Sequence, residues 1–228
     1  MKIYTSPYPS LSFPRESLYT FLFETRWNDH LATTAAFIDG STANVVTRAE
    51  LKQLTLSLAY GLRSEFSRLG GVSLRRGDVV MIFSPNNLAF PISLMGGIAA
   101  GLCMSLASAA YTPRELEHQW KDSRAKAIIV HPSLLTVVLK MFERLDMSST
   151  EAMRRIVLMG WQSVFTERSF DEYISLSDLF GRGSLQEEEK FSDSQAEDTA
   201  VLCYSSGTTG KPKGVEVHRK HRFRGTSN

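Results

Sequence analysis

Ten residues near the carboxyl end of the sequence, Ser205 to Gly214, combine the groups that bind phosphate. They comprise two serines, two threonines, three glycines, two lysines and one proline, without an acidic side chain. Glycines allow tight turns and close backbone approach to a ligand, hydroxyl and N–H groups donate to phosphate oxygens, and lysines add positive charge. The apolar run Val201–Tyr204 before them predicts a strand. The composition therefore predicts a loop that cradles a polyphosphate.

The spacing within this loop separates it from better-known phosphate and nucleophile motifs. A Walker loop needs Gly, four residues and then Gly-Lys-Ser/Thr, whereas Gly207 and Gly210 are three apart and Pro212 follows Lys211. Ser205 and Ser206 lack a Gly-x-Ser-x-Gly context, and the five histidines form no catalytic cluster, so hydrolase chemistry is not supported. Composition alone also allows a solvated hairpin loop without a ligand.

The stretch Val201–Val215 closely resembles the signature loop of the adenylate-forming superfamily, which includes acyl-CoA and aryl-CoA synthetases, peptide synthetase adenylation domains and beetle luciferases. Further blocks are similar to 4-coumarate:CoA ligase-like enzymes. These blocks are Ile3–Pro9, Gly77–Val80, Ser84–Asn86 and Tyr111–Leu116. The resemblance covers about residues 1–217 and is strongest over 77–123 and 201–215.

The resemblance implies a two-step ligase that uses ATP, Mg²⁺ and coenzyme A. A carboxylic acid and ATP would give an acyl-adenylate and pyrophosphate, and the thiol of coenzyme A would then displace AMP. In such a mechanism the loop stabilises the charge that develops on the pyrophosphate. Lys211 lies at a variable position of the family motif and is assigned no role. The implied phosphate contacts are Ser205, Ser206, Gly207, Thr208, Thr209 and Lys213.

Strand and helix patterns alternate upstream of the loop. Thr47 with Glu50 and Thr112 with Glu115 are capping boxes, and Pro113 suits the first turn of a helix. Alternation predicts an α/β fold, a mostly parallel sheet with helices on both faces. By resemblance this is an incomplete N-terminal part of the ligase large domain. The expected strands are 79–83, 103–106, 127–130 and 155–159, and the expected helices are 47–69, 87–100, 112–122 and 134–145.

Several classes of protein are disfavoured by composition. The uncharged run Val79–Pro113 is long enough for a membrane helix, but its prolines, asparagines and glycines divide it into strand, helix and strand. The N-terminus lacks a secretory signal, and Cys103 and Cys203 are a hundred positions apart, which favours a reducing compartment without disulfide or metal. We expect an intracellular protein, cytoplasmic or peroxisomal.

Positive charge is concentrated near the carboxyl end of the sequence. Residues 211–228 hold six Lys or Arg against one Glu. We predict a disordered basic tail at 218–228 after an AMP-binding portion at 1–217, and we consider the run Arg219–Arg224 accidental rather than a nucleic-acid patch. The acidic stretch Gly181–Asp198 is interpreted as a solvated connector, and Phe170–Phe180 as a possible helix.

The function that the sequence predicts is that of a truncated ATP-dependent carboxylate:CoA ligase. It retains the phosphate loop, whereas family elements for adenine, ribose, the acyl group and the C-terminal lysine are not found in it. His218 follows Gly214-Val215 more closely than the Ser/Thr-His of the family does. The alternative is a non-catalytic fragment that binds a nucleotide or a partner chain.

Overall fold

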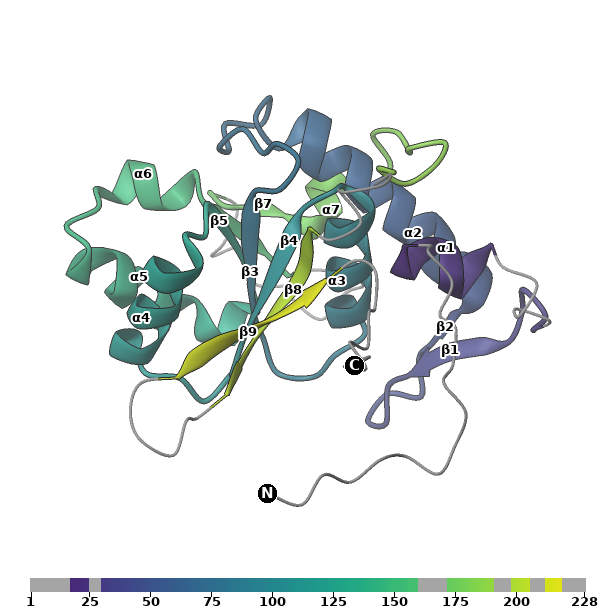
Figure 1. Ribbon diagram of the computed structural model, residues 1–228, viewed down its shortest axis with the longest axis horizontal. Helices are drawn as coiled ribbons and strands as arrows, with labels where there is room; N and C mark the ends of the chain where they lie inside the picture. The colour runs from purple at the N-terminus through teal and green to yellow at the C-terminus, as the bar shows by residue number, and fades with distance from the viewer. Residues whose placement is uncertain (1–16, 25–29, 160–171, 191–197, 206–211, 219–228) are drawn as a thin grey trace, which may run out of the picture.

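The structure, a computed structural model, describes residues 17–24, 30–159, 172–190, 198–205 and 212–218 (Figure 1). Its strands in chain order are β1 (Ala35–Ile38), β2 (Val45–Thr47), β3 (Val79–Phe83), β4 (Cys103–Ala107), β5 (Ala127–Val130), β6 (Ile156–Leu158), β7 (Ile174–Ser175), β8 (Thr199–Ser205) and β9 (Lys213–His218). The α-helices are α1 (Leu18–Phe23), α2 (Arg48–Tyr60), α3 (Ala89–Ala99), α4 (Pro113–Ser123), α5 (Leu135–Arg144), α6 (Ser149–Met153) and α7 (Leu176–Leu179).

Seven of the strands form one sheet in the order β7-β6-β5-β3-β4-β8-β9. In this spatial order the six strands from β7 through β8 are all parallel to their neighbours. The last described strand, β9, is antiparallel to β8. The two remaining strands, β1 and β2, pair as a separate antiparallel hairpin. The predicted mostly parallel α/β architecture is confirmed.

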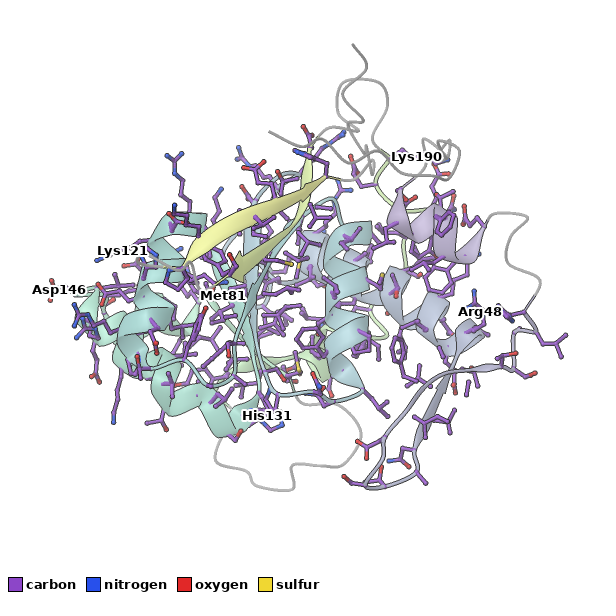
Figure 2. The ribbon with its side chains drawn as sticks, turned by 60° about the horizontal axis from the view of Figure 1, so that its bottom comes forward. Arg48, Met81, Lys121, His131, Asp146 and Lys190 are labelled. Atoms are coloured by element: carbon purple, nitrogen blue, oxygen red, sulfur yellow. The ribbon has the colours of Figure 1, made fainter. Side chains whose placement is uncertain are left out.

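Helices cover both faces of the sheet, and side chains of β3 alternate between two cores. Val80 and Ile82 join a core with residues of α1, α2, α3 and α7. Met81 and Phe83 join a second core with residues of α4, α5 and α6. Figure 2 shows Met81 among the interior side chains of this second layer. Because β3 and β5 are buried on both faces, long uncharged runs arise without any membrane. Among the described residues no helix combines the length and apolarity that a membrane crossing requires.

The two predicted capping boxes are present at the starts of α2 and α4. Thr47 accepts from the N–H of Glu50 at 3.2 Å and its own N–H donates to Glu50 Oε2 at 2.8 Å. Thr112 and Glu115 repeat this arrangement at 3.4 and 2.8 Å. These N–H donors hold the pKa values of Glu50 and Glu115 below their usual range. The predicted continuous helix 47–69 is altered, since Gly61–Glu65 forms a π-helical turn after α2.

A close approach explains the position of this π turn. A Cβ at Gly61 would lie 2.6 Å from the carbonyl oxygen of Leu179, in α7. The helix therefore widens where another element packs directly on its backbone. The segment that contains α7 also differs from the predicted helix 170–180. Within the described part of the expected helix 170–180, which is residues 172–180, residues 174–175 form the short parallel strand β7 and only Leu176–Leu179 are helical.

The acidic stretch after α7 is in part the solvated connector that was expected, since six of the ten residues at 181–190 are exposed, but it is also attached to the fold. Its backbone is attached to two helices, because Leu185 N donates to Leu56 O at 3.2 Å and Glu189 N donates to Ala99 O at 2.8 Å. The side chain of Glu188 is buried at 5% exposure and accepts hydrogen bonds from the hydroxyls of Ser17 and Thr20. The burial of Glu188 was not expected, because composition does not reveal which carboxylates find buried donors.

Candidate functional site

The predicted phosphate loop joins β8 to β9, so the two strands are its stems. Ser205 is the last residue of β8 and Lys213 the first of β9, and the two are paired across the antiparallel ladder. Both side chains are exposed. The structure thus brings together two of the six predicted phosphate contacts. The other four, Ser206, Gly207, Thr208 and Thr209, lie outside the described residues.

The position of the stems in the sheet matches the usual placement of ligand sites. Ser205 ends a strand that is parallel to β4, so both strands present their carboxyl ends at one edge of the sheet. Ligands of open parallel sheets bind outside this edge. The turn after β3 reaches the same edge, where Asn87 Oδ1 accepts from the N–H groups of Ala89 and Phe90 at 2.9 and 3.0 Å and so starts α3.

One face of the hairpin is attached to α4 through Tyr204. The Tyr204 hydroxyl donates to Asp122 Oδ2 at 2.6 Å. Burial, followed by this hydrogen bond to the carboxylate, raises the pKa of Tyr204, so the phenol stays protonated and remains a donor. A Cβ at Gly214, the cross-strand partner of Tyr204, would lie 3.2 Å from the ring. The glycine of the motif therefore leaves room for an aromatic ring that crosses it.

The second stem is attached to the same helix through His118. Its Nε2 lies 3.1 Å from the carbonyl oxygen of Pro212, which immediately precedes β9. Because a carbonyl oxygen only accepts, the ring carries its proton on Nε2. His118 and Asp122 are four residues apart, which places them on one face of the helix. In Figure 1 the hairpin extends across the sheet toward the side on which α4 lies.

These two α4 residues were missed at the level of sequence. His118 was interpreted as an isolated histidine, and Asp122 was considered only as the end of a predicted helix. The i, i+4 spacing indicates a shared face, but nothing in the sequence states that this face meets a strand more than 80 positions away. The other histidine near this edge, His131, follows β5 and accepts from the N–H of Ser133 at 3.3 Å through Nδ1. Burial lowers the pKa of His131.

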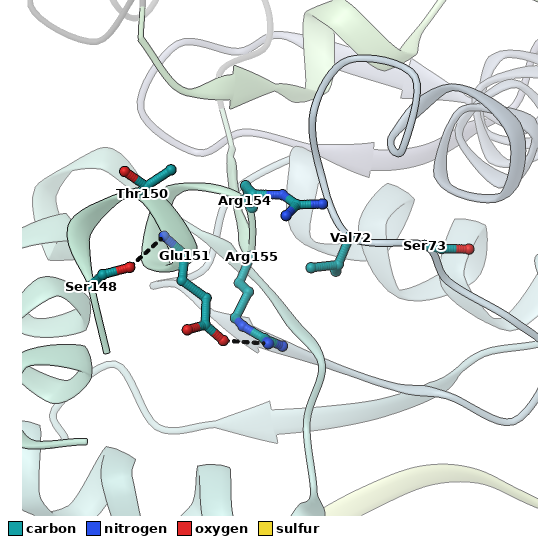
Figure 3. A pocket seen from close by; sticks show the side chains of 7 residues that line it. All are labelled: Val72, Ser73, Ser148, Thr150, Glu151, Arg154 and Arg155. Carbon is teal, nitrogen blue, oxygen red and sulfur yellow. Dashed lines mark hydrogen bonds and ion pairs between the residues drawn. The ribbon is translucent and has the colours of Figure 1, made fainter. Parts of the chain in front are cut away.

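A polar cavity of about 400 Å³ lies at the opposite, amino-terminal edge of the sheet (Figure 3). It contains two guanidinium groups that are engaged structurally. Arg155 donates to Glu151 Oε1 at 2.8 Å and to Lys126 O at 3.1 Å, and Arg154 Nε donates to Gly70 O at 3.1 Å. These contacts attach α6 and β6 to neighbouring loops. The two guanidinium groups of the cavity therefore serve to hold the fold together.

An apolar cavity of about 520 Å³ lies between the β1–β2 turn and the first turns of α3. Its polar groups are likewise engaged, since Asp39 Oδ1 accepts from the N–H groups of Ser41 and Thr42 at 2.8 and 2.9 Å. Over the residues described, no group of three or more His, Cys, Asp or Glu side chains could hold a metal ion. The hairpin stems remain the place where the described residues could contact phosphate.

Comparisons with known proteins identify the family of the chain. A sequence profile of the family described as AMP-binding enzyme matches residues 23–224. The chain is 29% identical over 220 residues to 4-coumarate–CoA ligase 3 of Arabidopsis thaliana, covering 96% of this chain and 35% of that protein. It is 29% identical over 236 residues to a long-chain-fatty-acid–CoA ligase of Yersinia pestis, covering 96% and 40%.

The fold comparison agrees as well. The luciferase-like enzyme of the nonluminescent mealworm Zophobas morio superposes with a TM-score of 0.70 at 22% identity, over 92% of this chain and 44% of that one. At this identity the likeness shows the fold alone. The chain thus spans about 35–40% of the length of the two curated relatives named above. On the extent of the profile match, the chain belongs to the AMP-binding enzyme family.

Proposed function

We propose that this chain is the phosphate-binding part of an ATP-dependent carboxylate:CoA ligase. In the complete ligase, a carboxylate and ATP would give an acyl-adenylate and pyrophosphate, and coenzyme A would then take the acyl group and release AMP. The observation that carries the proposal is the pairing of Ser205 with Lys213 at the carboxyl edge of the sheet, on stems attached to α4. Family membership gives the reaction class.

The role we propose for the loop is electrostatic. Negative charge develops on the pyrophosphate leaving group, and hydroxyl donors and an ammonium group that are already in place stabilise it without reorganisation. Ser205 and Lys213 fit this role because both side chains are exposed and adjacent across the ladder. We propose that the contacts to the β and γ phosphates come from Ser205, Ser206, Gly207, Thr208, Thr209 and Lys213.

Magnesium would accompany the nucleotide. Mg²⁺ in nucleotide sites is usually held by one or two carboxylates together with substrate phosphates and water. Coenzyme A and the carboxylic acid would be recognised by the complete ligase. We propose residues 1–217 as the N-terminal part of its AMP-binding domain and expect no acyl-CoA formation by the 228-residue chain alone.

Pyrophosphate titration followed by NMR tests the proposal directly. Lys213→Ala is expected to weaken binding about tenfold or more, because it removes the ammonium group next to Ser205. Lys211→Ala is the matched control, since it removes the same charge from a position with no assigned role. Equal weakening by both variants would show that the loss of affinity follows from net charge and not from the position of Lys213. Absence of pyrophosphate binding by the unmodified chain would refute the proposed function.

A second candidate, a non-catalytic fragment that binds a partner chain, is favoured by apolar side chains exposed at two edges. Ile38 of β1 is 63% exposed and Val215 of β9 is 52% exposed. Exposed apolar surface of sufficient area promotes association. Sedimentation velocity distinguishes the two candidates. A clean monomer that binds pyrophosphate supports the ligase proposal, whereas association without pyrophosphate binding supports the second candidate.

A further inference from the structure

Helix α4 contacts both stems of the hairpin, each at the residue that immediately precedes a proposed phosphate contact. Tyr204 precedes Ser205 and is bound by Asp122 at 2.6 Å. Pro212 precedes Lys213 and is bound by His118 at 3.1 Å. One helix therefore contacts both sides of the hairpin, at the end of β8 and just before β9. The bond to the Pro212 carbonyl restricts the backbone just before Lys213, where each residue has only two soft dihedrals, and the bond to the Tyr204 hydroxyl restricts the side chain next to Ser205.

The helix itself is held from other directions and can serve as a fixed support. Gln119 Nε2 donates to Ser105 Oγ at 2.9 Å and to Leu106 O at 3.1 Å, which attaches α4 to β4. Trp120 packs against Phe142 of α5 with ring centroids 5.0 Å apart. Glu117 accepts from Arg144 Nε of α5 at 2.7 Å. Separate faces of α4 thus contact the sheet, α5 and the hairpin.

The edge position of the hairpin makes this support necessary. Strand β9 has one strand neighbour, and five of its six residues are exposed. The opposite face of the hairpin end is open as well, since Val215 is 52% exposed and its cross-strand partner Cys203 is also exposed. Among the described residues, α4 provides the side-chain hydrogen bonds that fix both stems from outside the hairpin.

From this arrangement we infer that His118 and Asp122 are positioning residues for phosphate binding: they hold the stems so that Ser205 and Lys213 face one phosphate group together. This inference rests on the proposed function. Neither residue is proposed to contact phosphate: His118 acts through the backbone carbonyl of Pro212, and Asp122 acts through the side-chain hydroxyl of Tyr204. Asp122 provides the more stringent test, because its charge and its positioning role predict opposite effects on binding. Its negative charge disfavours a nearby anion, so its removal would strengthen phosphate binding unless its positioning role outweighs its charge.

The test compares variants of the full chain by pyrophosphate titration and by NMR relaxation of the Ser205 and Lys213 amides. Asp122→Ala and His118→Ala are each expected to weaken pyrophosphate binding roughly three- to tenfold, as loss of one hydrogen bond of ordinary strength predicts. Both should also increase the motion of the two amides. Asp122→Asn and His118→Gln, which keep an acceptor and a donor, should restore most of the affinity.

Glu117→Gln is the matched control, because it neutralises a carboxylate on the same helix that contacts α5 instead of the hairpin. It should leave pyrophosphate affinity unchanged or slightly higher. Tighter binding by Asp122→Ala, or unchanged amide motion in both alanine variants, would overturn the inference. If the unmodified chain fails to bind pyrophosphate, the proposed function is refuted, and increased amide motion in the alanine variants would still support the positioning role.

Discussion

The central strands β3 and β5 and the hairpin of β8 with the edge strand β9 belong to one sheet but are stabilised differently. Nearly every residue of β3 and β5 is buried, and their side chains fill two cores. Over its last three residues β8 is half-buried or exposed, and β9 is exposed over most of its length. Burial therefore fixes the centre of the sheet, whereas a few directed hydrogen bonds to α4 fix its edge.

This difference separates the residues that determine the fold from those proposed to act on a ligand. Apolar burial is strong but has no direction, so it specifies which strands lie inside. Hydrogen bonds contribute less free energy but fix orientation. A site that must present a hydroxyl and an ammonium group to water, at a defined separation, is therefore better placed at the edge.

The largest expected effect is in the central strands. Ile82→Ala should lower the free energy of unfolding by about 3 kcal/mol, because it removes a fully buried side chain and leaves a cavity. Val215→Ala in β9 should change it by less than about 0.5 kcal/mol. Urea denaturation measures both. If Ile82→Ala does not fold, Ile82→Val provides a milder step of about 1 kcal/mol. Equal losses at positions 82 and 215 would abolish the distinction between centre and edge.

The next effect concerns the start of α4, the helix that connects the two regions. Thr112→Ala should cost about 1 kcal/mol of stability, because the cap that accepts from Glu115 N is lost. Thr112→Ser retains the hydroxyl and is the control. A loss of the same size in the serine variant would show that the methyl group, rather than the cap, stabilises the helix.

A smaller effect is expected within the hairpin itself. Gly214→Val would place a branched side chain against the Tyr204 ring, where even a Cβ lies only 3.2 Å away. We expect it to displace the ring from Asp122, so that Tyr204→Phe becomes nearly silent in its presence. A double-mutant cycle should give a coupling of about 0.5 kcal/mol. Fully additive losses would mean that the ring and the glycine act independently.

The smallest effect is a pH dependence at the carboxyl end of β5. Burial lowers the pKa of His131, so the unfolded chain binds a proton more readily than the folded one. Stability from this residue is therefore present above the unfolded pKa, about 6.5, and is lost as the pH falls below it. Urea denaturation at pH 7.5 and 5.5 should show a smaller loss in His131→Asn than in the unmodified chain. An identical loss would assign the pH dependence to other groups.

Sequence patterns predicted the central region well because its determinants are local. Uncharged β-branched runs gave β3 and β5, and Thr47 and Thr112 marked helix starts through residues three positions away. The strand Val201–Tyr204, which the structure extends to Thr199–Ser205, was predicted for the same reason. Burial periodicity and capping depend on neighbours in the chain, so a sequence alone suffices to find them.

The remaining features depend on partners far away in the chain. The π turn at Gly61 arises where Leu179 packs on it, and Glu188 is buried because Ser17 and Thr20 supply donors. The contacts of His118 and Asp122 with the hairpin join positions 94 and 82 residues apart. No local pattern encodes these contacts. The residue types of the proposed site can be taken from the sequence, but its support by α4 cannot.

The buried Glu188 carboxylate has a consequence for synthesis on the ribosome. It lies 171 positions after Ser17, whose hydroxyl it accepts from, and it is the acceptor for Thr20 as well. At roughly 5–20 residues per second, translation needs about ten to thirty seconds to cover that distance. Throughout this interval the helix that begins at Leu18 has been made without the partner of its hydroxyl groups. The contacts that hold the start of α1 can thus form only after residue 188 has been made.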